Sequence, residues 1–269
     1  MTNNIKSYLE TERMNAVFFS ILYICIGFIW WLIALTVGLP LTLLLMLSDK
    51  FRSSFFTWVY VNIAVPLQRR EVYVIRNKVF QILKDSLVNK NSLLPLEILE
   101  IGVGHGPNLK FYPEKCNLTV LDKNKYFEKE FTKNKNKYPQ VSYQKTVIQP
   151  AECMKGVEDN SFDVVVSTFF HCSCDDSAAV LREVKRVLKP GGKYLFLDHT
   201  GFPEGDIGLF IQRFFNPLWS LIFDGCYLDK NPSKQIKEAG FSDVQFLKHI
   251  SLNFRRYLLR HQVLGIATK

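Results

Sequence analysis

One stretch limits what this chain can fold into more than any other: a short apolar run that ends in a glycine-rich turn. Residues 96–106 read Leu-Glu-Ile-Leu-Glu-Ile-Gly-Val-Gly-His-Gly, so a buried strand over residues 98–101 leads directly into three alternating glycines. Glycine has no Cβ, so this turn can take positive φ values and a ligand can lie directly against its backbone. In open α/β sheets, nucleotide-like ligands bind at such turns, beyond the carboxyl end of a parallel strand. The stretch therefore predicts an α/β sheet with a small-molecule site.

Two acidic residues near the turn indicate which ligand the site takes. Glu100 precedes the first glycine, where a carboxylate repels a pyrophosphate but suits an amino group. Asp122 ends the next apolar run, where it can accept hydrogen bonds from a ribose diol. Pro107 stands where the dinucleotide fingerprint has glycine or alanine. S-adenosylmethionine has a ribose and an amino group but no phosphate, so we predict it as the cofactor.

An uncharged run near the start of the chain predicts a membrane anchor. Residues 14–48 hold no charged side chain over 35 positions, whereas a bilayer core needs about 20 apolar residues. A secretory signal has a shorter apolar region and a small-residue cleavage site, which this run lacks. We expect the run to be retained in the protein and to contact lipid.

The arrangement of this anchor stays open. Gly38 and Pro40 interrupt the run, and a proline inside a helix causes a kink. Either a single span over residues 17–37 is followed by a short interfacial piece, or the run forms a hairpin that enters and leaves on one face. Trp30 and Trp31 lie in the middle of the run, which favours the kinked or re-entrant form. A buried pair of helices in a soluble protein is a third interpretation.

The rest of the chain predicts a linker and a catalytic domain. Residues 53–67 are apolar and aromatic, and they either lie in the membrane interface or cap the catalytic domain. Apolar side chains recur at helical spacing over residues 68–88, which predicts an amphipathic helix. We therefore divide the chain into an anchor (1–52), amphipathic linker helices (53–95) and a catalytic domain (96–269).

Strands and helices alternate from residue 96 onward. The apolar run over residues 162–168 is typical of a central parallel strand that is buried on both faces. An aromatic helix over residues 207–223 is either continuous or broken at Pro217. The pattern predicts a doubly wound, seven-stranded, mostly parallel α/β sheet whose last strand is antiparallel. The expected strands are 98–101, 118–121, 141–148, 162–168, 194–198, 244–252 and 261–268, and the expected helices are 124–137, 177–188, 207–223 and 233–239.

Charge and cysteine content narrow the possible partners. The net charge is +9, and six lysines fall between residues 123 and 137, where they form either a solvated helix face or a contact to anionic lipid. We expect no nucleic acid partner, because no recognition motif accompanies the charge. Cys172-Ser-Cys174 is too tight for a common zinc site and has no matching second pair, so we predict no metal. Reduced cysteines are typical of a domain that faces the cytosol.

Several motifs, in this order, resemble the class I S-adenosylmethionine-dependent methyltransferases. They are Glu100-x-Gly-x-Gly-x-Gly106, Asp122, Pro150-Ala-Glu152, Val164-Val-Val-Ser167 and Leu188-Lys-Pro-Gly-Gly192. Further motifs behind the apolar run are similar to those of the membrane-bound thiol S-methyltransferases of the methyltransferase-like group. They are Asn108-Leu-Lys-Phe-Tyr-Pro113, Asp198-His199, Asn216-Pro-Leu-Trp219 and Phe223-Asp-Gly-Cys226.

The resemblance implies contacts to the cofactor and a class of substrate. It implies that the methionine part of the cofactor lies on Gly102, Gly104 and Gly106, that Asp122 binds its ribose, that Ala151 and Glu152 border its adenine, and that Thr168 faces it. It also implies an endoplasmic reticulum or lipid droplet location and alkyl thiol substrates. This chain departs from the family pattern at three positions: His105, His171 and Asp198.

A thiol must lose its proton before it can accept a methyl group, since the thiolate is the nucleophile. Three candidates lie at predicted strand ends, namely His171, Asp198 and His199. We expect the Asp198-His199 pair to orient or deprotonate the thiol; alternatively, it is a structural pair that holds the following loop. Asp224 is either a turn residue or a pocket residue. An aromatic set forms either the pocket wall or part of the core: Phe169, Phe170, Phe210, Phe214, Phe215 and Trp219.

The sequence thus predicts a membrane-anchored methyltransferase that uses S-adenosylmethionine to methylate small hydrophobic thiols. A lipid or quinone oxygen or carbon is the alternative acceptor. A non-catalytic lipid droplet or endoplasmic reticulum surface protein that keeps a remnant of the fold is the alternative from another class. The oligomeric state stays open.

Overall fold

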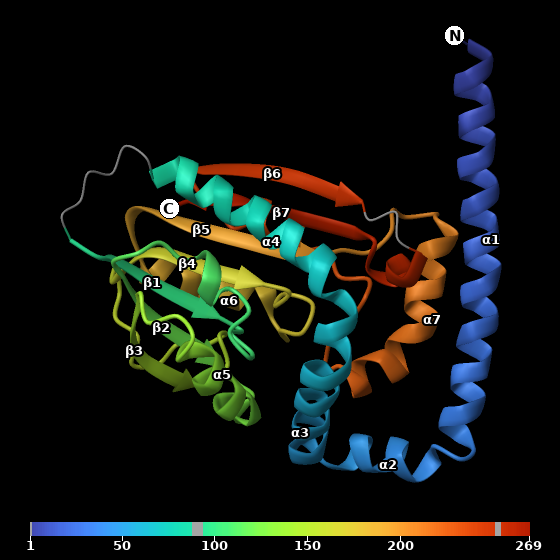
Figure 1. The fold of residues 1–269 in the computed structure, drawn as a ribbon, viewed down its shortest axis with the longest axis horizontal. Helices are drawn as coiled ribbons and strands as arrows, with labels where there is room; N and C mark the ends of the chain where they lie inside the picture. Colours follow the sequence, from blue (N-terminus) through green and yellow to red (C-terminus); the bar gives the residue numbers. More distant parts are fainter. Residues whose placement is uncertain (1, 88–93, 251–253) are drawn as a thin grey trace.

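A seven-stranded sheet forms the centre of the molecule (Figure 1), and the computed structural model describes residues 2–87, 94–250 and 254–269. The strand order is β3-β2-β1-β4-β5-β7-β6, with β7 antiparallel to both of its neighbours. This confirms the predicted doubly wound, mostly parallel sheet with an antiparallel last strand. The strands are β1 (Leu96–Ile101), β2 (Cys116–Asp122), β3 (Val141–Ile148), β4 (Phe162–Thr168), β5 (Leu188–His199), β6 (Asp243–Ile250) and β7 (His261–Thr268).

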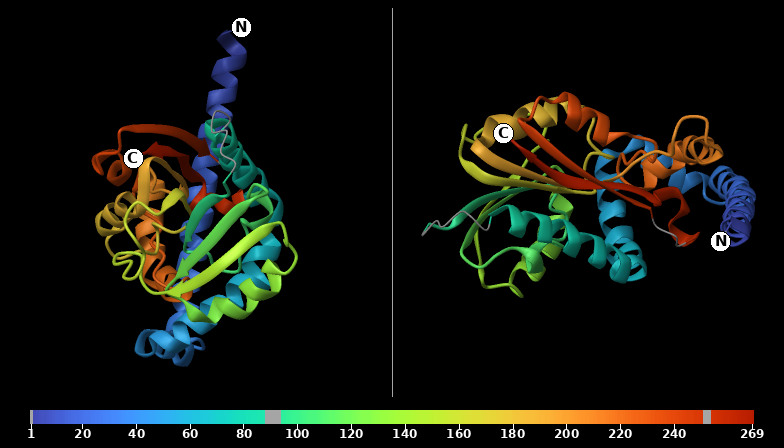
Figure 2. Two further views of the ribbon diagram at one scale, coloured as in Figure 1. Left: turned by 90° about the vertical axis from the view of Figure 1, so that its left-hand side faces the viewer. Right: turned by 90° about the horizontal axis from the view of Figure 1, so that it is seen from above.

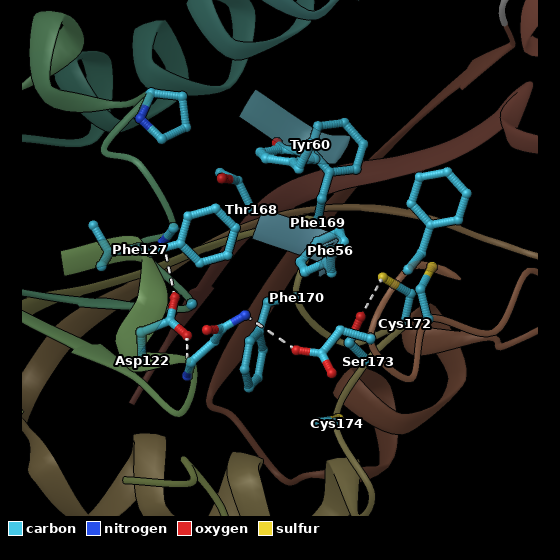
Figure 3. Close-up of a pocket in the computed structure, with 18 of the residues that line it drawn as sticks. Phe56, Tyr60, Asp122, Phe127, Thr168, Phe169, Phe170, Cys172, Ser173 and Cys174 are labelled. Carbon is cyan, nitrogen blue, oxygen red and sulfur yellow. Dashed lines mark hydrogen bonds between the residues drawn. The ribbon is translucent and has the colours of Figure 1, made fainter. Parts of the chain in front are cut away.

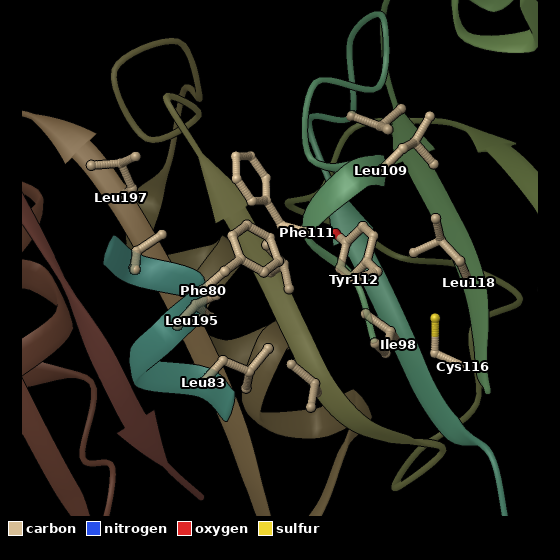
Figure 4. Close-up of a cluster of buried hydrophobic side chains, with 14 of the residues drawn as sticks. Phe80, Leu83, Ile98, Leu109, Phe111, Tyr112, Cys116, Leu118, Leu195 and Leu197 are labelled. Carbon is tan, nitrogen blue, oxygen red and sulfur yellow. The ribbon is translucent and has the colours of Figure 1, made fainter. Parts of the chain in front are cut away.

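Side chains that alternate along the central strands build one core layer on each face of the sheet. Ile98 of β1 packs in the layer under α4 (Val65–Leu87) and α5 (Glu128–Lys135), whereas Leu99 packs in the layer under α6 (Ser177–Val187) and α8 (Pro232–Glu238). Figure 4 shows Phe80 and Leu83 of α4 against the sheet residues of the first layer. Because α4 supplies buried side chains, it is part of the core of the catalytic domain.

The predicted elements agree with the structure except at their ends. The helix expected over 124–137 begins as a 3₁₀ turn (Lys125–Phe127) before α5. α7 (Ile207–Ile222) continues through Pro217 without a break. β5 begins at Leu188, and its pairing with β4 is irregular there. Residue 88 of the amphipathic helix and residues 251–252 of the sixth strand lie outside the described residues.

The N-terminal run forms two helices joined by a short turn, α1 (Thr2–Leu35) and α2 (Leu39–Leu47). α1 lies alongside α7 at one edge of the molecule, and its first turns project beyond the rest (Figures 1 and 2). Among the described residues, the segment Val17–Leu35 is long and apolar enough to cross a membrane by length and composition.

One stripe of α1 packs on the catalytic domain, and the opposite stripe is exposed. The Trp30 ring lies 5.2 Å from that of Phe215, and a Cβ at Gly27 would meet the Phe214 ring at 2.6 Å, so the glycine allows this close approach. The packed stripe is Ser20, Tyr23, Gly27, Trp30 and Ala34. The exposed stripe is Phe18, Ile21, Cys25, Leu32 and Leu35. Phe28 lies between the two stripes, because it is 63% exposed while its ring lies 5.3 Å from that of Phe214.

After α2 the chain returns toward the carboxyl ends of the strands. It forms α3 (Asp49–Val59), one π-helical turn (Tyr60–Ala64) and then α4 in a continuous path (Figure 1). Ser48 caps α3 by accepting a hydrogen bond from Phe51 N–H at 3.2 Å. We call α3 and the π-helical turn the roof segment, because they cover the cavity described below.

Candidate active site

A cavity lies at the carboxyl ends of β1, β2, β4 and β5, where ligands of open α/β sheets bind. The roof segment and α4 close one side of it with Phe56, Tyr60, Ala64, Val72 and Arg76. In Figure 3 the rings of Phe56, Tyr60, Phe127 and Phe169 gather over the position of Asp122. Of the predicted cofactor residues, the cavity is lined by Gly102, Gly104, Asp122, Ala151, Glu152 and Thr168.

The glycine turn presents bare backbone to the cavity. Gly102 and Gly104 have φ values of +68° and +53°, in the region that side chains disfavour. A Cβ on Gly102 would meet the Phe170 ring at 2.6 Å, whereas a Cβ on Gly104 would meet nothing within 4 Å and would project into open space. Gly106 packs under Leu109 and Phe131 behind the turn. The open space above Gly104 fits a cofactor that lies directly on the turn.

Asp122 is fixed at the end of β2. Its Oδ2 accepts a hydrogen bond from Gly104 N–H at 2.8 Å, and its Oδ1 accepts one from Asn124 N–H at 2.8 Å. Burial raises the pKa of Asp122, although these two backbone donors work to lower it. Glu152 also lines the cavity and accepts a hydrogen bond from Asp175 N–H at 2.9 Å. The hydrogen bond from Gly104 places the Asp122 carboxylate beside the glycine turn, the position from which a ribose diol is bound.

Glu100 belongs to a buried polar network behind the turn. It is 1% exposed and accepts hydrogen bonds from Asn108 Nδ2 at 2.8 Å and from the Tyr112 hydroxyl at 2.6 Å. Burial raises the pKa of Glu100 to about 7, even though these two donors and the charge of Arg76 work to lower it. Glu100 therefore lies one layer behind the cavity wall, where it orients Asn108.

Arg76 of α4 is the cofactor-side residue that the sequence did not reveal. It is buried, lines the cavity, and donates to Asn108 Oδ1 and, at 2.8 Å, to Thr168 Oγ1. Its Nε has no hydrogen-bond partner among the described residues. Burial lowers the pKa of Arg76, but a guanidinium stays charged in proteins. The weak signal in the sequence is a charged residue at helical spacing from the apolar Val72 and Val79.

These donors and acceptors fit S-adenosylmethionine. The methionine part of this molecule carries a carboxylate, which matches the buried guanidinium of Arg76 and its unsatisfied Nε. Its ribose matches Asp122, and its adenine matches the apolar and aromatic walls. Arg76 and the backbone of the glycine turn would hold the amino acid end, and Asp122 would hold the ribose.

The three candidate bases occupy different positions. Asp198 lies behind the cavity and accepts hydrogen bonds from the backbone N–H groups of Phe170, His171 and His199 at 2.9, 2.6 and 3.0 Å. The His171 ring lies between the hydroxyls of Ser177 and Tyr194, and burial together with Lys230 lowers the pKa of this histidine to about 4. Of the three, His199 lines the cavity.

His199 lies beside two cysteine sulfurs in the wall of the cavity. Its Nε2 lies 3.3 Å from Cys226 Sγ, and Trp219 Nε1–H donates to the same sulfur at 3.4 Å. Burial lowers the pKa of His199, but Cys172 and Asp198 outweigh it, so the net shift is upward. The hydrogen bond between Cys172 and Cys226, in which the neutral Cys172 thiol takes part, and burial raise the pKa of the Cys172 thiol well above its usual value. Cys172 and Cys226 come from loops far apart in the sequence, so no local pattern marked this group.

The aromatic residues divide between wall and core. Phe169, Phe170 and Trp219 line the cavity, whereas Phe214 and Phe215 pack against α1. Phe210 is exposed. Three of the predicted aromatic residues therefore line the cavity. The side of α7 that carries Phe214 and Phe215 packs against α1 instead.

Two further polar residues hold the roof segment and the turn in place. Asp224 accepts hydrogen bonds from Ser53 Oγ at 3.1 Å and from Asn124 Nδ2 at 3.2 Å, which ties α3 to the end of β2. His105 lies edge-on to the Tyr60 ring at 5.5 Å, and burial lowers the pKa of His105 to about 4. Asp224 is thus a pocket residue with a structural contact to the roof segment.

Known proteins resemble this chain in sequence and in fold. Residues 99–196 match the family described as a methyltransferase domain. The thiol S-methyltransferase TMT1B of Rattus norvegicus is 35% identical over 216 residues, which cover 80% of this chain and 87% of that protein. The thiol S-methyltransferase TMT1A of Homo sapiens is 38% identical over 174 residues, which cover 65% and 71%. The crystal structure of the CurJ carbon methyltransferase has a TM-score of 0.57 at 18% identity, covering 79% of this chain and 57% of that one.

The glycine turn, the acid after β2, the strand order and these relatives agree with one another. They confirm S-adenosylmethionine as the cofactor and set aside the alternative of a non-catalytic remnant. The protein is a methyltransferase that uses S-adenosylmethionine, and it belongs to the family of the thiol S-methyltransferases TMT1A and TMT1B.

Proposed function

We propose that the protein methylates small hydrophobic thiols that reach it from a membrane. The observation that carries this proposal is the shape of the cavity, which runs from the glycine turn to His199 between aromatic walls. Apolar walls with a few polar groups at the end are typical of sites for small apolar ligands. The printed activity of the relatives TMT1A and TMT1B supports a thiol as the acceptor.

For methyl transfer to a thiol, the protein has to position the two reactants and to remove the thiol proton. Bound S-adenosylmethionine supplies a methyl group that its sulfonium sulfur has already activated. The aromatic walls exclude water and align the acceptor, which lowers the entropic part of the barrier. A free thiol has a pKa near 8.5, so the site must favour the thiolate. We assign this role to His199, with Asp198 as the positioning residue that fixes the backbone of the strand end and of the loop after β4.

A panel of acceptors tests the substrate class. We expect the full chain to methylate alkyl thiols, and we expect His199→Ala to lower that rate by about 100-fold, a usual effect for loss of a proton-transfer group. His171→Ala is the matched comparison, because its ring lies outside the cavity; it should keep the cofactor affinity and most of the rate. Turnover of quinols or lipids but not of thiols would replace the acceptor by the alternative one. Full activity in both His199→Ala and Asp198→Asn would rule out the role of this pair.

We also propose that α1 and α2 lie in one membrane leaflet, with the catalytic domain on the cytosolic side of the endoplasmic reticulum or a lipid droplet. The packed stripe from Ser20 to Ala34 is covered by the catalytic domain. As long as this packing is kept, lipid can contact α1 on its exposed stripe alone. α2 has nine residues and rises about 14 Å, too short to return across a core of about 30 Å. Both conditions are met when α1 and α2 lie in the plane of the interface, with the exposed stripe of α1 in lipid and its packed stripe on α7.

Charges on the outer stripe of α1 should release the protein from membranes. Phe18 and Leu32 are 62% and 64% exposed, so Phe18→Glu/Leu32→Glu changes the lipid-facing surface and leaves the ring contacts between α1 and α7 intact. We expect this variant to move to the soluble fraction on alkaline carbonate extraction. Leu247→Glu, an equally apolar exposed position on β6, should stay with the membrane. Retention of the Phe18→Glu/Leu32→Glu protein in the membrane fraction would overturn this arrangement.

A further inference from the structure

Three side chains at the acceptor end of the cavity form a compact sulfur and nitrogen cluster. Cys172 follows β4, His199 is the last residue of β5, and Cys226 follows α7. Their ligand atoms, two Sγ and one imidazole nitrogen, all lie within 4.8 Å of one another. Cys172 and His199 are buried, and Cys226 is partly buried. All three line the cavity, and Cys172 is labelled in Figure 3.

The backbone around the cluster is fixed by contacts that do not involve the cluster atoms. Tyr227 N–H donates to the Cys172 carbonyl at 2.9 Å, which holds the loop after α7 against the loop after β4. His199 is held by its place in β5, where it pairs with Gln262 of β7. The three side chains are therefore brought together by the fold rather than by a flexible loop.

We propose that Cys172, His199 and Cys226 bind a zinc-class divalent metal ion whose fourth position opens into the cavity. Two thiolates and one imidazole are a donor set that favours such ions. Three protein ligands with one open position are the pattern of catalytic rather than structural zinc sites. Around one tetrahedral zinc ion, with Zn–S near 2.3 Å and Zn–N near 2.0–2.1 Å, ligand atoms lie about 3.5–3.8 Å apart. The observed separations reach this spacing with a side-chain movement of about 1 Å or less.

Charge balance favours the same assignment. Two thiolates and a neutral imidazole cancel the charge of a divalent ion, so the loaded site is neutral, as a buried site requires. The same cavity holds the cationic sulfonium of the cofactor, so an added thiolate at the open position would be attracted to its neighbour. Cys174, by contrast, turns away from the cluster and contacts Ser177 Oγ at 3.0 Å.

The metal would position the acceptor thiol and favour its thiolate form. This consequence rests on the proposed function. A thiol that binds at the open position forms one sulfur–metal bond and releases its S–H proton to water, with no change in oxidation state. Its sulfur then keeps a lone pair directed into the cavity. His199 would act on the thiol through the metal, as a ligand rather than as a free base, which agrees with the 3.3 Å separation of its Nε2 from Cys226 Sγ.

Cobalt binding to the full chain tests the metal site without relying on activity. We expect the reduced protein, freed of metal by a chelator, to bind one equivalent of Co²⁺ with the visible absorption of tetrahedral thiolate coordination. Cys226→Ser and Cys172→Ser should each weaken binding by more than about 100-fold, beyond the 10- to 100-fold cost of losing an outer partner. Cys153→Ser is the matched control, since Cys153 is exposed and outside the cluster, and it should bind Co²⁺ like the wild type. Calorimetric binding of S-adenosylmethionine verifies that each variant is folded.

The outcomes separate the metal site from the proposed function. Added alkyl thiol should change the Co²⁺ spectrum of the wild type, since the thiolate takes the open position. Thiol methylation by a protein that binds no Co²⁺ would overturn the metal site and leave the proposed function standing. Stoichiometric Co²⁺ binding that needs both cysteines, without any thiol turnover, would support the metal site and overturn the acceptor. A Cys172–Cys226 disulfide in the fully active enzyme would also overturn the metal site.

Discussion

Replacing Arg76 with leucine is expected to lower the free energy of unfolding by about 3–5 kcal/mol at pH 8, the usual cost of removing one partner from a buried charge network. Arg76 is 3% exposed, donates to Asn108 and Thr168, and is a cation near the buried Glu100. Leucine keeps the apolar volume but leaves these acceptors without a donor. Urea unfolding of the full chain in detergent, followed by tryptophan fluorescence, measures the change. Binding of S-adenosylmethionine should weaken in the fraction that stays folded.

The size of this loss should depend on pH in one direction. Burial raises the pKa of Glu100 from 4.5 to about 7 in the folded state, so the folded protein binds this proton more tightly than the unfolded chain. That contribution to stability is present in acid and is lost as the pH rises from 4.5 through 7. Without Arg76 the folded-state pKa rises further, so Arg76→Leu should cost more at pH 8 than at pH 5. Adding Glu100→Gln should recover part of the loss at pH 8.

A surface arginine provides the control for this first prediction. Arg182 is exposed, and its ion pair with Asp176 is long, at 4.0 Å. Arg182→Leu should therefore change the free energy of unfolding by less than about 0.5 kcal/mol at either pH. An equal loss for Arg76→Leu at pH 5 and pH 8 would contradict the electrostatic explanation and leave only lost packing.

Valine at Gly104 should weaken S-adenosylmethionine binding by more than about 1,000-fold, or about 4 kcal/mol. The added carbons project into the open space above the turn, where a Cβ meets nothing within 4 Å. The turn cannot swing the side chain aside, because its φ of +53° is fixed by the hydrogen bond from Gly104 N–H to Asp122. Isothermal titration calorimetry with S-adenosylmethionine measures this loss.

The variant Gly191→Val is the control that distinguishes the loss of space for the ligand from strain in the backbone. Its φ of +72° and the absence of any atom within 4 Å of an added Cβ match Gly104, but it precedes the central part of β5 at the opposite end of the sheet. Both valine variants should lose stability, because left-handed backbone disfavours side chains by about 1–2 kcal/mol. Only Gly104→Val should lose cofactor affinity. A similar loss of affinity in Gly191→Val would trace the effect to stability rather than to the turn.

The cofactor end of the site could be predicted because its signals are local. β1, Gly102 and Gly104 form one continuous stretch, and Asp122 ends the very next strand, so the fold brings them together in any parallel sheet. The predicted roles of Gly106 and Glu100 were read from the same motif, although both lie behind the cavity wall. Position in a motif predicts where the backbone passes, and not which way a side chain points.

His199 and Trp219 were predicted as site residues and line the cavity, but Cys172, Cys226 and Arg76 could not be predicted, because they meet the other residues only through the topology. Cys172 and Cys226 lie 54 positions apart, and His199 lies between them on another strand. Arg76 comes from a helix that precedes the sheet altogether. The two stripes of α1 are both apolar, so periodicity alone could not tell the stripe that packs on α7 from the one left exposed.

The roof segment has a practical consequence for anyone who wishes to purify the enzyme. The chain passes from the apolar helices α1 and α2 into α3 at Ser48, whose side chain caps α3, and Phe56 and Tyr60 line the cavity just beyond it. Arg52 and Ser53 join the same helix to Asp224. A truncation that removes residues 1–48 to gain solubility would leave α3 without its Ser48 cap and without the preceding helix α2. We therefore expect preparations of the full chain in detergent or nanodiscs to keep the roof segment over the cavity.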